Sequence, residues 1–209
     1  MAVVYFSLGA NIGDKRNNMI TAVALLSERV GSILALSDLY ETTPWGFVSE
    51  NNFLNAALMM DTTLSPNEIL ALTQERERNM GLSQKSEGEY HDRVIDIDIL
   101  MYDDWVIDTP LLTLPHPLMH QRSFVLGPLS EIAHTCIHPV LNRSIGELYL
   151  ALPTKNRKVC LYPEISLYLC TRTDVDRFVC LQPREKMLKS KFLFLSIASA
   201  SSTCSQFKI

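Results

Sequence analysis

Two aspartates, Asp96 and Asp98, are the residues whose type and spacing most directly suggest chemistry. They alternate with isoleucines in the run Arg93 to Leu100, and on a β-strand residues i and i+2 point to the same face. The carboxylates therefore project together, while the isoleucines anchor the opposite face in the core. Adjacent carboxylates on a core strand repel each other and need a compensating cation, and Mg²⁺ prefers such oxygen ligands. The run predicts a site for one or two Mg²⁺ ions, which can clamp a transferring phosphoryl group. The alternative is an ordinary strand in which polar and apolar residues alternate and the polar face contacts only solvent.

Candidate phosphate ligands follow this run. His116 lies between Pro115 and Pro117, which restrict the local backbone, and Arg122 comes shortly afterwards. A histidine and an arginine downstream of a carboxylate pair are suitable partners for phosphate oxygens. The alternative for a lone surface histidine is that it has no functional role.

A third group of residues suits a flat ring. Phe53, Asn55 and Ala57 share one face of a predicted strand. An aromatic ring beside a bifunctional amide fits a heterocycle that has its own donors and acceptors. The alternative is a packed core phenylalanine and an asparagine that caps a turn.

A small set of strands must position these residues. Val3 to Leu8 is apolar on both faces, as in a central strand. Three further stretches are typical of strands: residues 33–40, 52–62 and 94–102.

Two helices are expected between these strands. Asp14 is the predicted N-cap of the first, whose apolar residues recur at helical spacing until Gly31 ends it. Ser65 to Glu68 form a capping box that opens the second helix, which Gly81 ends. The order β-α-β-β-α-β predicts an α+β fold, a ferredoxin-like two-layer α/β sandwich. Extra C-terminal elements follow it and include a small helix over residues 144–152.

Charge divides the chain into two parts. Residues 1–152 have 9 Lys and Arg against 19 Asp and Glu, and residues 153–209 have 10 against 4, which together give the formal net charge of −4. We therefore expect one main domain over residues 1–152, the part that carries the candidate catalytic residues above, and an appended basic tail of unknown function and poor order over residues 153–209. The acidic main part argues against a nucleic-acid partner, which needs clustered positive charge.

The location of the protein is predicted from what the sequence lacks. No apolar run reaches the roughly 18 to 20 residues needed to cross a bilayer, so no membrane partner is expected. The N-terminal residues do not have the basic leader and cleavage site of a secretory signal. The sequence therefore predicts a cytoplasmic protein, which we expect to be a monomer.

Five motifs, in this order and spacing, together resemble one family. They are Ser-Leu-Gly-Ala-Asn (7–11), Tyr-Glu-Thr-Thr-Pro-Trp-Gly (40–46), Phe-Leu-Asn-Ala-Ala (53–57), Asp-Arg-Val-Ile-Asp-Ile-Asp-Ile-Leu (92–100) and Pro-His-Pro…Arg-Ser-Phe-Val-Leu-Gly-Pro-Leu (115–129). The chain from about residue 2 to about residue 152 is similar to the 6-hydroxymethyl-7,8-dihydropterin pyrophosphokinases, HPPK. The resemblance implies an ATP-dependent transferase of folate biosynthesis whose partners are two small molecules, ATP and the pterin.

The resemblance also implies roles for individual residues. Asp96 and Asp98 match the pair that holds two Mg²⁺ ions, and Phe53 and Phe124 match the rings that sandwich the pterin. Further pterin contacts fall on Thr42, Thr43, Trp45 and Asn55. The contacts to ATP fall on Gln74, Lys85, Arg93, Ile99, His116 and Arg122. Of these, Arg93, His116 and Arg122 join the two aspartates as the implied catalytic residues.

The implied mechanism is in-line attack by the hydroxymethyl oxygen on the β-phosphorus of MgATP, with AMP as the leaving group. Catalysis then depends on positioning and charge neutralisation. The run of residues 81–93 departs from the family pattern, because Leu82 and Gln84 stand where arginines are common. Lys85 and Arg93 are the positive charges left there.

Two other functions stay open on the sequence. The RNA-recognition motif has the same element order, but its sheet face must be basic and aromatic, whereas residues 1–152 are acidic. The other is a catalytically lapsed scaffold that still binds a pterin or a nucleotide.

Overall fold

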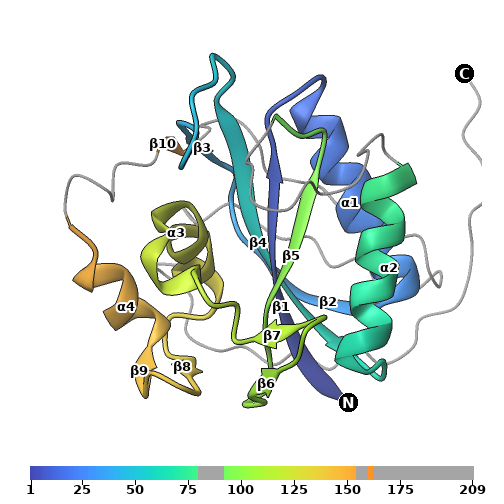
Figure 1. The fold of residues 1–209 in the computed structure, drawn as a ribbon, viewed down its shortest axis with the longest axis vertical. Coiled ribbons are helices and arrows are strands. Elements are labelled where there is room, and N and C mark those ends of the chain that lie inside the picture. Colours follow the sequence, from blue (N-terminus) through green and yellow to red (C-terminus); the bar gives the residue numbers. More distant parts are fainter. Residues whose placement is uncertain (80–91, 154–159, 162–209) are drawn as a thin grey trace, which may run out of the picture.

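One large antiparallel sheet organises the fold in this computed structural model, which describes residues 1–79, 92–153 and 160–161 (Figure 1). Its strands are β1 (Ala2–Ala10), β2 (Gly31–Leu36), β3 (Tyr40–Thr42), β4 (Phe53–Thr62), β5 (Asp96–Tyr102) and β10 (Cys160–Leu161). The strand order is β10-β3-β4-β1-β5, and β2 also pairs with β4. The centre of the sheet is therefore β4 and β1, with β5 at one edge.

Helices cover both faces of this sheet (Figure 1). They are α1 (Lys15–Arg29), α2 (Pro66–Asn79), α3 (Ser123–Ile132) and α4 (Ile145–Ala151), with a 3₁₀ turn, η1 (Met119–Gln121), before α3. α1 and α2 pack on one face, whereas α3 and α4 lie on the other. Two small hairpins complete the fold: β6 (Ile107–Asp108) with β7 (Thr113–Leu114), and β8 (Ile137–His138) with β9 (Arg143–Ser144). The predicted ferredoxin-like α+β arrangement is confirmed, and its extra C-terminal elements form a helical layer on the second face.

Two hydrophobic cores hold the layers together, one on each face of the sheet. The isoleucines of the β5 run, Ile95, Ile97 and Ile99, are buried in the core beneath α1 and α2. Alternate residues of the same sheet, such as Tyr5 and Ala57, pack into the second core beneath α3 and α4. Because strand side chains alternate between faces, burying the isoleucines turns the two aspartates of β5 to the other face.

Local hydrogen bonds explain where the helices begin. The side chain of Asp14 accepts a hydrogen bond from the amide of Asn17 at 3.0 Å, which confirms it as the N-cap of α1. Before α2, a Glu68 carboxylate oxygen accepts from the amide of Ser65 at 2.7 Å, as expected for a capping box. Ser144 and Glu147 form a second complete capping box at the start of α4.

The predicted strand over residues 33–40 is wrong in one respect, because it is two strands. β2 ends at Leu36 and β3 begins at Tyr40. Between them Ser37 bonds to β4 through its own side chain, since its hydroxyl accepts from the amide of Ala57 at 2.9 Å. This side-chain bond replaces one backbone bond of the ladder and lets the chain change direction before β3.

α1 ends just before Gly31, as predicted, but this glycine does not have the positive φ of a left-handed helix cap. The helix ends at Arg29 with Val30 as its C-cap, and Gly31 is the first residue of β2. A side chain at Gly31 would collide with the backbone carbonyl of Asp61 on β4. The glycine is therefore required by the close approach of two strands, and the predicted end of α2 at Gly81 lies outside the described residues.

The predicted tail contributes one short element to the sheet. β10 pairs with β3, with Cys160 opposite Glu41 and Leu161 opposite Tyr40. The rest of residues 154–209 lies outside the described part of the chain. Within the part that is described, no helix is long and apolar enough to cross a membrane.

Candidate active site

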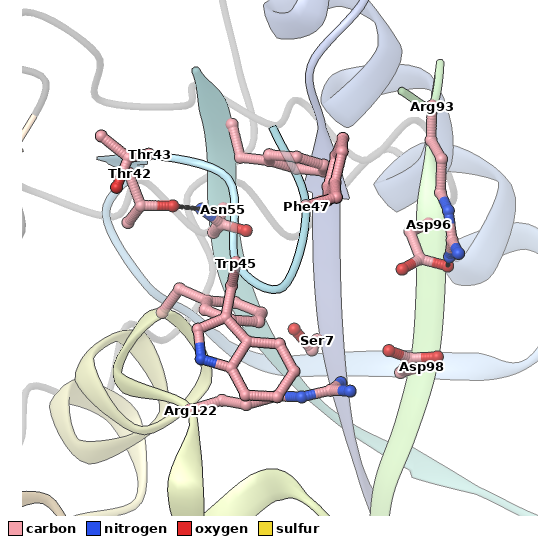
Figure 2. Close-up of a pocket in the computed structure, with 13 residues that line it drawn as sticks. Ser7, Thr42, Thr43, Trp45, Phe47, Asn55, Arg93, Asp96, Asp98 and Arg122 are labelled. Carbon is pink, nitrogen blue, oxygen red and sulfur yellow. Dashed lines mark hydrogen bonds and ion pairs between the residues drawn. The ribbon is translucent and has the colours of Figure 1, made fainter. Parts of the chain in front are cut away.

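A pocket opens on the α3 side of the sheet, where β1, β4 and β5 lie next to one another (Figure 2). Its lining residues come from these three strands, from the end of β3 and the loop after it, from the segment before β5, and from the start of α3: Ser7, Gly9, Thr42, Thr43, Trp45, Phe47, Phe53, Asn55, Arg93, Asp96, Asp98, Arg122 and Phe124. Strand register explains this grouping. Gly9 on β1 lies opposite Asn55 on β4 and opposite Asp96 on β5. Ser7 lies opposite Asp98.

The two aspartates lie on one wall of this pocket, as predicted. Figure 2 shows both carboxylates on β5, on the side of the strand that faces the pocket. The guanidinium of Arg93 donates to Oδ1 of Asp96 at 2.7 Å, and both side chains are largely buried. An arginine is therefore already held against the carboxylate pair.

Aromatic rings form the opposite wall. Trp45 lies 6.3 Å from Phe124 between ring centroids, and Phe47 meets Phe53 edge-on at 6.1 Å. The guanidinium carbon of Arg122 lies 5.0 Å from the centroid of the Trp45 ring. Figure 2 shows Arg122 extending past Trp45 toward Asp98. This wall combines flat apolar surface with a cation, which suits an aromatic ligand next to an anionic one.

Asn55 supplies the polar group at the base of the slot. Only 2% of it is exposed, and its Nδ2 donates to the hydroxyl of Thr42 at 2.9 Å and to the carbonyl of Tyr40 at 3.3 Å. Both amide hydrogens are thereby committed to β3, so Oδ1 is the atom that can accept from a ligand. A Cβ at Gly9 would lie 3.3 Å from this Oδ1, so the glycine leaves the oxygen accessible.

A second hollow adjoins the first and shares Asp98 with it. Its lining includes three residues of the implied ATP set, Gln74 on α2, Ile99 on β5 and His116, together with Thr73 and residues 111–113. The His116 ring accepts a hydrogen bond from the amide of Leu118 at its Nδ1, 3.3 Å away. In a neutral ring the proton therefore lies on Nε2, which makes that nitrogen a donor suited to a phosphate oxygen.

The structure thus divides the predicted residues between two adjoining hollows. All predicted pterin residues, with Arg93 and Arg122, line the first, and the other described ATP candidates line the second. Lys85 lies outside the described residues. The prediction missed Ser7, Gly9 and Phe47 as lining residues. Ser7 and Gly9 belong to the first motif and are two residues apart on a strand. That spacing indicates that they share one face of the strand, which could have identified them as lining residues.

Asp96 and Asp98 fit Mg²⁺ as judged by their donor set. Mg²⁺ is usually held by one or two carboxylates together with substrate phosphates and water. Among the residues that the structure describes, no group of three or more His, Cys, Asp or Glu side chains is placed to hold a metal ion. A pair of carboxylates open to a pocket therefore suits an ion that arrives with its phosphate ligand, rather than a closed structural site.

This fold and pocket, with an aromatic wall, two arginines and a carboxylate pair, are those expected of a group transferase. The family model of 7,8-dihydro-6-hydroxymethylpterin-pyrophosphokinase (HPPK) matches residues 5–134. A 2-amino-4-hydroxy-6-hydroxymethyldihydropteridine pyrophosphokinase of Porphyromonas gingivalis is 50% identical over 141 residues, 66% of this chain and 95% of the relative. The chain therefore belongs to the HPPK family.

Two more distant proteins are similar to this chain, one in sequence and one in fold. A "Folic acid synthesis protein FOL1" of Dictyostelium discoideum is 38% identical over 151 residues, which are 72% of this chain and 22% of that longer protein. The crystal structure of Plasmodium falciparum HPPK-DHPS superposes with a TM-score of 0.60 at 18% identity, over 71% of this chain and 44% of that one. At that identity the structure supports the fold alone. The predictions of family, α+β fold, pyrophosphokinase class and folate biosynthesis are confirmed, and the two alternative functions gain no support.

Proposed function

We propose that this protein transfers the pyrophosphoryl group of ATP to the hydroxymethyl oxygen of 6-hydroxymethyl-7,8-dihydropterin, with release of AMP. The observation that supports this most directly is the position of Asp98, which lines both hollows. One hollow has the aromatic wall and the amide that a pterin needs. The other has the histidine suited to a phosphate. A group that passes from one ligand to the other must cross at the carboxylates between them.

The pterin is assigned to the slot between Phe53 and Phe124. A ring stacked there lies against apolar surface on both sides, and its polar edge faces Asn55, whose Oδ1 accepts an N–H from the pterin. Thr42, Thr43 and Trp45 close the same end of the slot. Because an acceptor there favours a ring with N–H donors on that edge, the site selects a pterin over a ring that has only acceptors.

ATP is assigned to the second hollow, with its phosphates directed toward Asp98. Nε2 of His116 donates to a phosphate oxygen, while Gln74 and Ile99 line the space for the rest of the nucleotide. Arg93 and Arg122 lie on the pterin side of the carboxylates and face the phosphoryl group in transfer. Lys85 is proposed as a further phosphate contact on the basis of the family resemblance alone.

Asp96 and Asp98 are proposed to hold two Mg²⁺ ions. When bound, these ions neutralise charge on the phosphate oxygens and on the attacking and leaving oxygens. The chain's own contribution is to place both carboxylates on one face of β5 and to hold Arg93 and Arg122 in the same hollow. In the ligand-free protein the Arg93 guanidinium already donates a hydrogen bond to Asp96, so Arg93 neutralises this carboxylate before a metal ion binds.

The reaction balances as a single displacement. A bond forms between the hydroxymethyl oxygen and the β-phosphorus of ATP, and the bond from that phosphorus to the oxygen bridging the α-phosphate breaks. The hydroxyl proton passes to solvent, and AMP leaves with the bridging oxygen. The residues named above contribute positioning and charge, and none of them forms a covalent intermediate.

Three finer points are part of the same proposal. The catalytic domain spans residues 1–152 with residues 153–209 appended, the protein acts as a monomer, and it acts in the cytoplasm. Gel filtration tests the second of these, because a monomer of 23.6 kDa elutes well after a globular marker of twice that mass, whereas a dimer elutes with it.

Chromatography of the nucleotides tests the function directly. The full chain is incubated with ATP and Mg²⁺, with and without the hydroxymethyl dihydropterin, and AMP, ADP and the pterin diphosphate are quantified. We expect AMP and the pterin diphosphate in equal amounts, only when the pterin is present. Formation of ADP, or AMP release independent of the pterin, would contradict the proposal.

A further inference from the structure

A hydrogen-bonded junction beside Arg93 ties three separate segments of the chain together. Asn11 directly follows β1, Asn51 lies in the loop before β4, and Asp92 precedes β5. Nδ2 of Asn11 donates to Oδ1 of Asp92 at 2.6 Å, and Nδ2 of Asn51 donates to Oδ2 of the same carboxylate at 2.9 Å. One carboxylate therefore joins the end of the central strand to the loop that forms part of the aromatic wall.

The backbone of Arg93 is held by the same junction. Its amide donates to Oδ1 of Asn11 at 2.6 Å, and its carbonyl accepts from the amides of Asn11 and Ile12 at 3.0 and 3.3 Å. Asn11 is only 3% exposed, so water cannot easily replace these bonds if one partner is lost. Nδ2 of Asn18 also donates to the carbonyl of Val94 at 3.1 Å, which fixes the next peptide.

The side chain of Arg93 starts from this fixed backbone and ends at Asp96. Its guanidinium bonds to Oδ1 of Asp96 at 2.7 Å, inside the pocket shown in Figure 2. A long, flexible side chain reaches a particular point only if its Cα is well placed, because each rotatable bond adds uncertainty at the tip. The position of the guanidinium therefore depends on the residues that hold the backbone of Arg93.

We propose that Asn11 is a positioning residue for phosphoryl transfer: its buried amide holds the backbone of Arg93 and so places the Arg93 guanidinium at the carboxylate pair. We also propose that Asp92 extends this restraint to the loop of residues 43–52, through Asn51. The proposal rests on the proposed function, since Arg93 is there the cation that faces the transferring group. Asn11 belongs to the first sequence motif, residues 7–11.

The charge state of Asp92 agrees with its place in the junction. Hydrogen bonds from Ser49 and Asn51 hold the pKa of the Asp92 carboxyl below its usual range, although burial acts in the opposite direction. The carboxylate is thus ionised at neutral pH and accepts from both asparagines at once. It can link the two segments without being protonated.

A double-mutant cycle distinguishes positioning from simple structural support. Asn11→Ala is expected to lower kcat at least about tenfold, because small misplacements of a charged group strongly reduce the rate. In the Arg93→Ala background the same change is expected to lower kcat by less than about twofold, because the group it positions is already absent. Asn17→Ala, an exposed asparagine of α1, is the matched control and should leave kcat unchanged.

Equal loss of kcat in both backgrounds would overturn the proposal, and so would an Arg93→Ala variant as active as the wild type. If Asn11→Ala does not fold, as judged by its thermal melt, Asp92→Ala removes the junction from its more exposed side and takes its place in the cycle. Asn51→Ala is expected to raise the KM for the pterin more than that for ATP, because it frees only the loop of residues 43–52. Equal changes in both KM values would overturn the extension through Asp92.

Amide hydrogen exchange, resolved by NMR, tests the junction without turnover. The Arg93 amide is expected to be protected in the wild type and to exchange at least about tenfold faster in Asn11→Ala, since its acceptor is removed. An unchanged rate would overturn the proposal even if the enzyme is active. A wild-type protein that releases no AMP, yet shows this loss of protection, would contradict the proposed function and leave the junction itself supported.

Discussion

The guanidinium of Arg93 lies 2.7 Å from Oδ1 of Asp96, across three residues of chain, in a site where both side chains are mostly buried. The cation proposed for phosphate is therefore the counter-ion of a carboxylate proposed for Mg²⁺. A Mg²⁺ ion bound at Asp96 would compete with the arginine for this carboxylate, and an arginine displaced from it would be available to the phosphates. The pair stabilises two like-charged aspartates before any ligand arrives.

Removal of this arginine should strengthen metal binding while weakening catalysis. We expect Arg93→Ala to bind Mn²⁺ alone roughly fivefold more tightly or better, because a positive charge near the carboxylates is lost. Turnover should fall in the same variant. Electron paramagnetic resonance of free Mn²⁺ gives the affinity, and Arg29→Ala, which breaks the exposed pair with Glu75, is the matched control. An unchanged Mn²⁺ affinity would show that Arg93 and the metal do not compete.

Asp98 should be required for turnover and dispensable for folding. Asp98→Asn keeps the shape of the side chain but removes the charge that the metal and both hollows share. We expect kcat to fall more than tenfold, a loss above about 1.4 kcal/mol in transition-state stabilisation, with an unchanged or higher Tm because repulsion from Asp96 is relieved. Steady-state kinetics and calorimetry measure the two effects, and Asp108→Asn on the exposed β6 hairpin is the control. Retention of more than a tenth of kcat would contradict the metal assignment.

The aromatic wall should determine affinity for the pterin but not for the nucleotide. Phe124→Ala removes one face of the proposed slot and the ring that packs beside Trp45. We expect the Kd of the pterin to rise roughly tenfold, since stacking contributes about 0.5–1.5 kcal/mol beyond buried area. The Kd of a non-hydrolysable ATP analogue should change little. Isothermal titration of both ligands checks this, with Trp105→Ala, a half-exposed ring against Tyr102, as the control. Equal losses for both ligands would indicate a general structural defect.

Two truncations should separate the kinetic contribution of β10 from that of the residues that follow it. A chain ending at Leu161 keeps the pairing with β3, whereas a chain ending at Pro153 loses it. β3 leads directly into Thr42 and Thr43 of the slot, so the shorter chain should have a higher KM for the pterin at similar kcat. The longer one should match the full chain, because every family motif lies before residue 153. Identical kinetics for both truncations would show that β10 does not affect the slot.

Stability should depend on pH through His138 of the β8–β9 hairpin. Its ring is 4% exposed, and Nδ1 accepts from the amides of Val140 and Leu141 at 3.3 and 3.2 Å. Burial lowers the pKa of His138, and the neighbouring His120 lowers it further. The unfolded chain then binds more protons than the folded one, so the stabilisation is complete above pH about 6.5 and decreases as pH falls through that value.

Chemical unfolding between about pH 5 and pH 7.5 tests this pH dependence against the ordinary histidine pKa near 6.5. In the wild type the free energy of unfolding should decrease toward acid. His138→Asn keeps an acceptor near Nδ1 without a titrating ring, so its profile should be flatter. If the free energy of unfolding changes with pH equally in the wild type and the variant, groups other than His138 cause the pH dependence.

The sequence by itself determined the features that depend on local backbone geometry. Asp96 and Asp98 share a face because strand side chains alternate, and the same period puts Phe53 and Asn55 together. Asp14 begins a helix because a side-chain acceptor is needed where backbone amides have no partner. Each of these features depends on residues that lie within a few positions of one another, so a short stretch of sequence is enough to predict it. The family motifs added the expected order of strands and helices.

Only the tertiary structure decided which distant residues meet. Sheet order and register bring Gly9 between Asn55 and Asp96, and the folding of the first motif against the segment before β5 brings Asn11 to Asp92. The division of residues 33–40 into two strands and the role of Gly31 likewise depend on β4, a partner more than a dozen residues away. Contacts of this kind are set by competition among whole-chain packings, in which loop paths and burial on both faces are satisfied together. No local period or propensity specifies that outcome, because the energy of each contact exists only after both segments have been placed.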